Sequence, residues 1–212
     1  VVETNRRGHA TRFAQDAVYP YGSGGPNASF ALITKAYMDR YGATREDFGR
    51  ICVAQRDNAL AFPHALMKKP LTLKEYMEAR AISDPIHLFD CVMPCAGAEA
   101  FLVCTEERAR DLGLPFVRIL STIERHNAFM DDSVQYRGGW VVDLDDLYGL
   151  AGAKPVDVDL LQTYDDYPVI SLMQIEDLGF CKKGEAADFI RDKDLTFRGD
   201  FPHNTSGGQL SV

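Results

Sequence analysis

The residues with the clearest chemical potential form a polar cluster at positions 164–168, Tyr-Asp-Asp-Tyr-Pro. The run 156–163 before this cluster is typical of a short strand, and the run behind Pro168 has helical spacing that ends at Gly179. Pro168 suits the first turn of a helix, where its missing N–H group costs nothing. Since α/β folds place their chemistry at strand-to-helix junctions, the cluster is a candidate active site. The alternative is a helix cap with no catalytic role.

A second polar stretch, residues 125–140, contains His126 together with arginine, aspartate, aromatic and glycine residues. Such a loop can line a substrate channel or contact a partner, and it can equally be a solvated excursion. His126 has no partner at a catalytic spacing. A substrate-binding role for His126 is therefore a hypothesis without a motif behind it.

Metal binding is the third chemistry to consider, because His87, Cys91 and Cys95 are spaced four residues apart. Closed zinc sites normally have a second ligand pair at short spacing, and the sequence contains none. We therefore expect no metal ion.

The composition restricts the class of protein. With 212 residues the chain can bury a core, and 46% hydrophobic with 25% charged residues is typical of a globular protein. The net charge of −8 argues against nucleic-acid binding and against an anionic membrane surface. No apolar run is long enough for membrane insertion, and no signal peptide opens the chain. Five cysteines without framework spacing indicate reduced thiols in a cytoplasmic protein.

The elements that would position these residues begin with helices. Helices are predicted for residues 26–40, for a segment capped by Thr44 that ends before Pro63, and for residues 72–80. No strand is predicted between these helices, so they read as a helical subdomain or insertion.

A layered α/β part is predicted after the helices. The apolar runs 98–104 and 116–123 flank a short helix that begins at Thr105. Strand, helix and strand in this order predict a parallel pair in an α/β sheet. Because the chain opens at Val1 without Met and closes on a glycine turn before Val212, we expect an internal piece of a longer protein.

Several motifs together resemble the thiolase superfamily. Residues 204–208, Asn-Thr-Ser-Gly-Gly, resemble the Asn-x-x-Gly-Gly turn of thiolases. Residues 164–167 lie where thiolases carry Asn-Glu-Ala-Phe and where the sterol-carrier-protein-x branch carries His-Asp-Cys-Phe. Further landmarks occur in the same order: Tyr-Gly-Ala-Thr at 41–44, Pro-Leu-Thr at 70–72, the segment 91–100, and Asp-Val-Asp at 157–159.

This resemblance implies a thiolase fold, in which two βαβαβαββ halves form a five-layered αβαβα core with a helical loop domain inserted in the first half. Residues 1–96 would be the helical loop region and the path back to the first half. Residues 97–116 would be the last strand and helix of that half, and residues 117–212 would begin the second half.

The resemblance also implies chemistry on acyl-CoA thioesters, in which a carbon–carbon bond next to the thioester carbonyl is made or broken. Thiolases use a nucleophilic Cys and an oxyanion hole. The first expectation is therefore a thiolase-like acyl-CoA acyltransferase, with the CoA thioester as substrate and no cofactor. Tyr164 would orient the thioester oxygen, Asp165 would support Tyr164, and Asn204 would shape the adjacent turn with Gly207 and Gly208.

Departures from the family keep two alternatives open. The family nucleophile would precede this chain and the Gly-His-Pro motif would follow Val212, while Tyr164 replaces the usual Asn or His. A tyrosine at this place resembles the thiolase-like aldolases of steroid side-chain breakdown, which cleave β-hydroxyacyl-CoA by retro-aldol chemistry without a Cys nucleophile. Tyr164 would then move the β-hydroxyl proton, although an ordinary phenol is a poor base. Ala96, where the family has Asp, keeps open the second alternative, a non-catalytic acyl-CoA- or lipid-binding subunit.

The partners implied by the resemblance are a second copy of the chain in a homodimer and, for the aldolases, a small subunit built of a zinc ribbon and an OB-fold.

Overall fold

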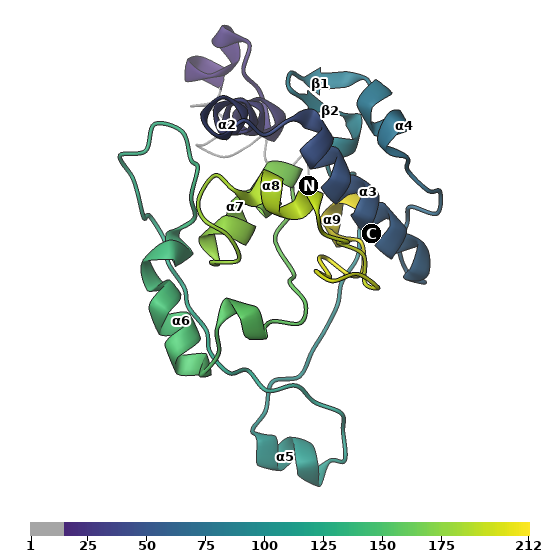
Figure 1. The fold of residues 1–212 in the computed structure, drawn as a ribbon, viewed down its shortest axis with the longest axis vertical. Helices are drawn as coiled ribbons and strands as arrows, with labels where there is room; N and C mark the ends of the chain where they lie inside the picture. Colours follow the sequence, from purple (N-terminus) through teal and green to yellow (C-terminus); the bar gives the residue numbers. More distant parts are fainter. Residues whose placement is uncertain (1–14) are drawn as a thin grey trace.

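The computed structural model describes residues 15–212 and shows a body of packed helices from which one long excursion extends (Figure 1). Residues 1–14, which open the predicted helical loop region, lie outside the described residues. Across residues 15–212, every helix is too short or too polar to cross a lipid bilayer. The α-helices of the body are α2 (Pro26–Tyr41), α3 (Arg45–Ala61), α4 (Leu73–Glu78), α7 (Pro168–Asp177), α8 (Ala186–Arg191) and α9 (Gly208–Ser211).

Helix α3 is the centre of the body, because it contacts α4, α7, α8 and α9. Its start is fixed by a capping box, in which the Thr44 backbone N–H and hydroxyl both donate to Asp47 Oδ2 at 2.8 Å. Phe48, Ile51 and Cys52 are buried in the core. The helix predicted after Thr44 is therefore confirmed.

Helix α7 follows the polar cluster and is buried along its whole length. Pro168 occupies the first turn, and Gly179 lies two residues past the end with φ of 83°. Both ends therefore match the sequence prediction. The burial of an entire helix gives the junction before it a rigid base, since close-packed interiors leave side chains little freedom.

The strands of residues 15–212 form a two-stranded antiparallel sheet of β1 (Ala81–Ser83) and β2 (Ile86–His87). The predicted strand 156–163 is reduced to the 3₁₀ turn η5 (Pro155–Asp157) and one isolated parallel bridge between Leu161 and His203. In this bridge the Leu161 N–H donates to Pro202 O at 2.9 Å. The bridge matters because it brings the polar cluster beside the glycine turn.

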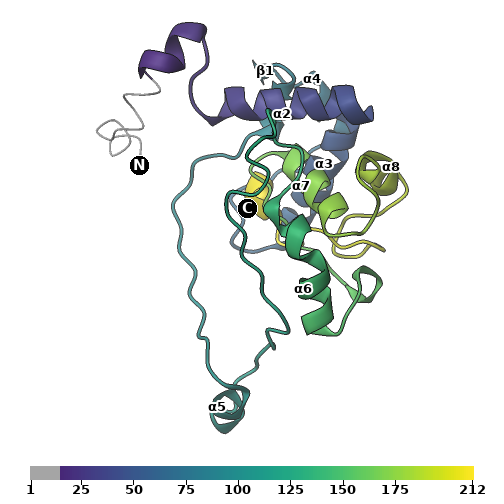
Figure 2. The ribbon, with the colours of Figure 1, turned by 90° about the vertical axis from the view of Figure 1, so that its left-hand side faces the viewer.

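The predicted parallel pair of strands is wrong for this structure. Residues 98–104 and 116–123 run as extended arms on either side of α5 (Glu106–Asp111), which lies at the far end of the excursion (Figure 2). A strand needs a neighbour for its backbone hydrogen bonds, and within residues 15–212 these arms have none. Their apolar side chains are consequently exposed, with Phe101 at 89% and Val117 at 92%.

The chain returns to the body through the 3₁₀ turn η4 (Gly139–Asp143) and helix α6 (Leu144–Ala151). Tyr148 of α6 donates its hydroxyl to Leu178 O at 2.9 Å, just past the end of α7. Helix α6 is thereby attached to the buried helix that supports the polar cluster.

Candidate functional site

The site is built around Asp165, whose carboxylate is buried and faces the first turn of α9. Oδ1 accepts the Gln209 N–H at 3.0 Å, and Oδ2 accepts the Leu210 N–H at 3.3 Å. Burial raises the pKa of Asp165, and these two backbone N–H groups partly oppose the shift because they stabilise the charged form. Asp165 therefore joins the polar cluster to the glycine turn and does not itself reach solvent.

Two glycines let the turn approach this carboxylate. Gly208 has φ of 61°, and a Cβ there would overlap Asp165 Oδ2. Gly207 has φ of 117°, and a Cβ there would lie 2.7 Å from the Ala59 side chain on α3. Both positions thus require glycine for its left-handed backbone and for close packing.

Asn204, the first residue of the glycine turn, binds the backbone of Thr163 through its side chain. Its Oδ1 accepts the Thr163 N–H at 2.7 Å, and its Nδ2 donates to Thr163 O at 3.2 Å. The Asn204 backbone has φ of 44°, a conformation that Asn tolerates better than most residues. The amide is buried, so in this structure Asn204 fixes the residue before Tyr164 and does not project from the surface.

Among the predicted residues that meet at this turn, Tyr164 is the exposed one, with 52% of the residue exposed. Its backbone is clamped by Gln174 of α7, whose Oε1 accepts the Tyr164 N–H at 3.1 Å and whose Nε2 donates to Tyr164 O at 2.6 Å. Interaction with the neighbouring Asp166 carboxylate, followed by partial burial, raises the pKa of Tyr164 to about 12. The phenol is therefore protonated at neutral pH.

The far end of the cluster is anchored to α2. The Tyr167 hydroxyl donates to Asn27 Oδ1 at 2.6 Å, and its ring stacks on Phe30 with 4.2 Å between the ring centroids. Burial raises the pKa of Tyr167 to about 12, so this hydroxyl also stays protonated. The cluster is thus held from three sides, by α2, by α7 and by the glycine turn.

The structure brings five of the six predicted site residues together, namely Tyr164, Asp165, Asn204, Gly207 and Gly208. His126 is apart from them: its exposed ring contacts Glu124 Oε1 at 2.7 Å. Its substrate-binding role stays a prediction. Three further members were missed by the sequence reading: Thr163, Gln174 and His203, all buried. Polar residues inside otherwise apolar runs were the signal available for Thr163 and Gln174.

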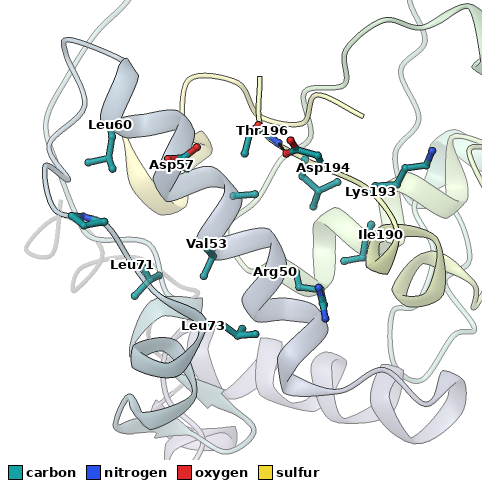
Figure 3. Close-up of a pocket in the computed structure, with 13 residues that line it drawn as sticks. Arg50, Val53, Asp57, Leu60, Leu71, Leu73, Ile190, Lys193, Asp194 and Thr196 are labelled. Atoms are coloured by element: carbon teal, nitrogen blue, oxygen red, sulfur yellow. Dashed lines mark hydrogen bonds between the residues drawn. The ribbon is translucent and has the colours of Figure 1, made fainter. Parts of the chain in front are cut away.

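A separate groove of about 430 Å³ lies on the other face of α3 (Figure 3). In Figure 3, Val53 of α3 lies on the side of Leu71, whereas Ile190 and Thr196 lie on the other side of the helix. None of the six predicted site residues lines this groove. Its lining is Arg50, Val53, Ala54, Asp57, Leu60, Pro70, Leu71, Leu73, Ile190, Lys193, Asp194, Leu195 and Thr196.

Comparison with known proteins agrees with these motifs. Residues 145–212, which contain the polar cluster and the glycine turn, match the family described as Thiolase C-terminal domain-like. A solved structure titled Ltp2-ChsH2(DUF35) aldolase is similar over 97% of this chain and 56% of its own, with a TM-score of 0.75 and 31% sequence identity. The chain is thus similar to proteins of the thiolase superfamily over nearly its whole length, and its fold is part of the thiolase fold.

The curated relatives indicate which kinds of thiolase-like enzyme the chain resembles. The chain is 36% identical over 199 residues to a steroid side-chain-cleaving aldolase of Thermomonospora curvata, covering 90% of this chain and 51% of the relative. It is 37% identical over 200 residues to the 17-hydroxy-3-oxo-4-pregnene-20-carboxyl-CoA lyase of Mycobacterium tuberculosis, covering 91% and 52%. An acetyl-CoA acetyltransferase of Methanothermobacter thermautotrophicus is 28% identical over 182 residues, covering 84% and 48%.

These relatives are enzymes, and they support the retro-aldolase expectation better than the acyltransferase expectation. The chain spans about half the length of the curated relatives it matches.

Proposed function

We propose that this chain carries the tyrosine centre, meaning Tyr164 and the residues that hold it, of a thiolase-like aldolase. Such an enzyme cleaves a β-hydroxyacyl-CoA by retro-aldol chemistry. The observation that carries the proposal is the placement of Tyr164: an exposed phenol stands where thiolases have Asn or His, on a backbone fixed by buried Gln174 and Asn204. The names of the two aldolase-type relatives support a bulky acyl group of the steroid side-chain type.

The proposed reaction begins at the β-hydroxyl of the substrate. Its proton passes to the Tyr164 oxygen while Tyr164 gives its own proton to Asp166, so no free tyrosinate has to form. The Cα–Cβ bond breaks, the β-carbon becomes a ketone or aldehyde, and the electron pair forms the enolate of the thioester. A proton from solvent adds to the enolate at Cα and gives the shortened acyl-CoA, while Asp166 releases to solvent the proton that it accepted. General acid–base transfer of this kind contributes roughly 10²- to 10⁴-fold to a rate.

Asp165 and Asn204 act in this proposal as positioning groups. Both are buried: Asn204 holds the backbone of Thr163, the residue before Tyr164, and Asp165, the residue after it, accepts the Gln209 N–H in the first turn of α9. The reaction uses the CoA thioester as substrate and needs no further cofactor.

We also propose partner chains and a cellular location for the protein. We infer a homodimer that works with a zinc-ribbon and OB-fold subunit; the two-component title of the similar solved structure supports a partner chain. We place the protein in the cytoplasm, and the five free thiols support this choice. Co-purification of the complete protein with the product of a neighbouring zinc-ribbon gene, followed by mass measurement in solution, tests both the partner and the dimer.

The activity is tested with the complete protein that contains this chain, together with that partner. One reaction receives a β-hydroxyacyl-CoA without free CoA, and a second receives a β-ketoacyl-CoA with free CoA, while mass spectrometry follows the products. We expect a carbonyl compound and a shortened acyl-CoA from the first reaction. Cleavage in the second reaction alone would establish an acyltransferase instead, and tight binding without turnover in either would establish a binding subunit.

A further inference from the structure

His203 lies immediately before Asn204 of the glycine turn and is fully buried, at 0% exposure. None of the sequence motifs gives it a role. Its Nε2 lies 2.8 Å from the Thr163 hydroxyl, which also lies 2.9 Å from the Ser171 hydroxyl on α7. Asn204 Nδ2 approaches the same hydroxyl at 3.4 Å. One hydroxyl thus connects the glycine turn, the residue before Tyr164 and the buried helix.

The other ring nitrogen of His203 makes no hydrogen bond to the described residues. Within residues 15–212, Nδ1 is buried and has no hydrogen-bond partner. Burial lowers the pKa of His203 to about 4, so the ring is neutral at physiological pH. A neutral ring has one N–H, and its tautomer follows from the surrounding network.

The network favours the N–H on Nε2. A Thr hydroxyl has one proton to donate, and Asn204 Nδ2 can only donate to it. With the N–H on Nε2, His203 donates to Thr163, Thr163 donates to Ser171, and only an acceptor lone pair is left over. The opposite tautomer would leave a buried N–H group without an acceptor, which costs the full desolvation of a donor.

We propose that His203 is a positioning residue: it fixes the Thr163 hydroxyl by donating from Nε2 and thereby holds the Tyr164 backbone and the glycine turn in one arrangement. This inference rests on the proposed function, because it assigns His203 to the orientation of the tyrosine centre. His203 does not touch the substrate. Its effect on turnover passes through Thr163, the residue immediately before Tyr164.

The test uses a pair of variants in the complete protein. His203→Gln keeps an amide N–H near the position of Nε2, whereas His203→Leu fills the space and removes the donor. We expect His203→Leu to lower kcat about 10- to 100-fold with little change in KM, because a small displacement of a catalytic group has effects of this size. His203→Gln should keep kcat within about 3-fold of the parent enzyme, because it preserves the contact.

A second pair covers the case in which His203→Leu does not fold. Thr163→Val removes the shared hydroxyl and Thr163→Ser keeps it, so the first should lose kcat and the second should retain it. Thr196→Val makes the same change in the groove on the other face of α3 and serves as the matched control with unchanged activity. Where both single variants fold, the double variant with His203→Leu should be no slower than the slower single variant, since both break one network.

The results separate the inference from the function on which it rests. If the parent enzyme cleaves β-hydroxyacyl-CoA but His203→Leu or Thr163→Val does so with parental kcat, the positioning role of His203 is wrong while the aldolase stands. Equal losses in the Gln and Leu variants would also overturn it, since the Nε2 donor would then not matter. If the parent enzyme itself does not cleave this substrate, the proposed function fails, and the His203 proposal fails with it.

Discussion

Tyr164 and Asp165 are neighbours in the sequence with opposite environments. The phenol of Tyr164 is half exposed, while the carboxylate of Asp165 is enclosed by the first turn of α9. The exposed residue can meet a substrate, and the buried one fixes the backbone that carries it. At the scale of single residues, this division explains how one short motif can supply both a reacting group and its support.

The effect of Asp166 on Tyr164 gives a prediction about pH. The neighbouring Asp166 carboxylate favours the protonated form of the phenol, which raises the pKa of Tyr164 to about 12. Asp166→Asn removes that carboxylate, so we expect the pKa of Tyr164 to fall toward its ordinary value. Ultraviolet titration of tyrosinate, with Tyr164→Phe as the reference that identifies the signal, measures this change. An unchanged titration in Asp166→Asn would show that the carboxylate does not act on the phenol.

His203 gives a prediction about stability. Its pKa is lowered in the folded state from 6.5 to about 4, so between these values the unfolded chain binds more protons than the folded chain. The contribution of neutral His203 to the free energy of unfolding is complete above pH 6.5 and is lost as the pH falls toward 4. The stability of the parent relative to His203→Gln, which cannot titrate there, should therefore drop by about 3 kcal/mol between neutral pH and pH 4.

Melting both proteins at pH 7 and near pH 4 measures that difference, and shared carboxylates cancel in the comparison. A difference that is equal at both pH values would contradict the buried neutral state of His203.

At the scale of elements, the glycine turn requires its two glycines for different reasons, and Gly208 offers the sharper test. Gly208→Ala forces a Cβ onto Asp165 Oδ2 at a positive φ, so we expect a loss of about 2 kcal/mol or more. The control is Gly149→Ala in α6, where a Cβ meets nothing within 4 Å and helix propensity favours alanine. Denaturant unfolding compares the two, and equal stability in both variants would mean that the turn is not packed against Asp165.

The elements also show which features can be read from a sequence. Helices α3 and α4 begin at capping boxes of nearby residues, and such local signals are complete within a few positions. A strand depends on a partner elsewhere, which is why residues 98–104 have strand composition without strand structure. In the site, the motif predicted Tyr164 and Asp165. The role of His203 depends on a contact with Thr163, 40 residues earlier in the chain, and spacing does not reveal it.

At the scale of the whole molecule, the rest of residues 15–212 does not account for the extended, exposed conformation of the two arms beside α5. They expose Phe101 and Val117 almost fully, and the thiolase fold implied by the resemblance has strands in its core. We therefore expect residues 98–104 and 116–123 to pair as strands in the complete, assembled protein. Hydrogen exchange followed by mass spectrometry should show slow amides in both segments, and exchange at the rate of an unfolded peptide would refute this pairing.

Tyr164 carries the proposed proton transfer, so the most direct measurement is the rate of β-hydroxyacyl-CoA cleavage by Tyr164→Phe in the complete protein. The variant removes one hydroxyl from a half-exposed side chain, so the fold should be preserved. Tyr21→Phe, on a residue that is 85% exposed outside the site, is the matched control and should keep parental turnover. We predict a fall in kcat of about 100-fold or more for Tyr164→Phe. Parental turnover in that variant would contradict the assignment of the proton transfer to Tyr164.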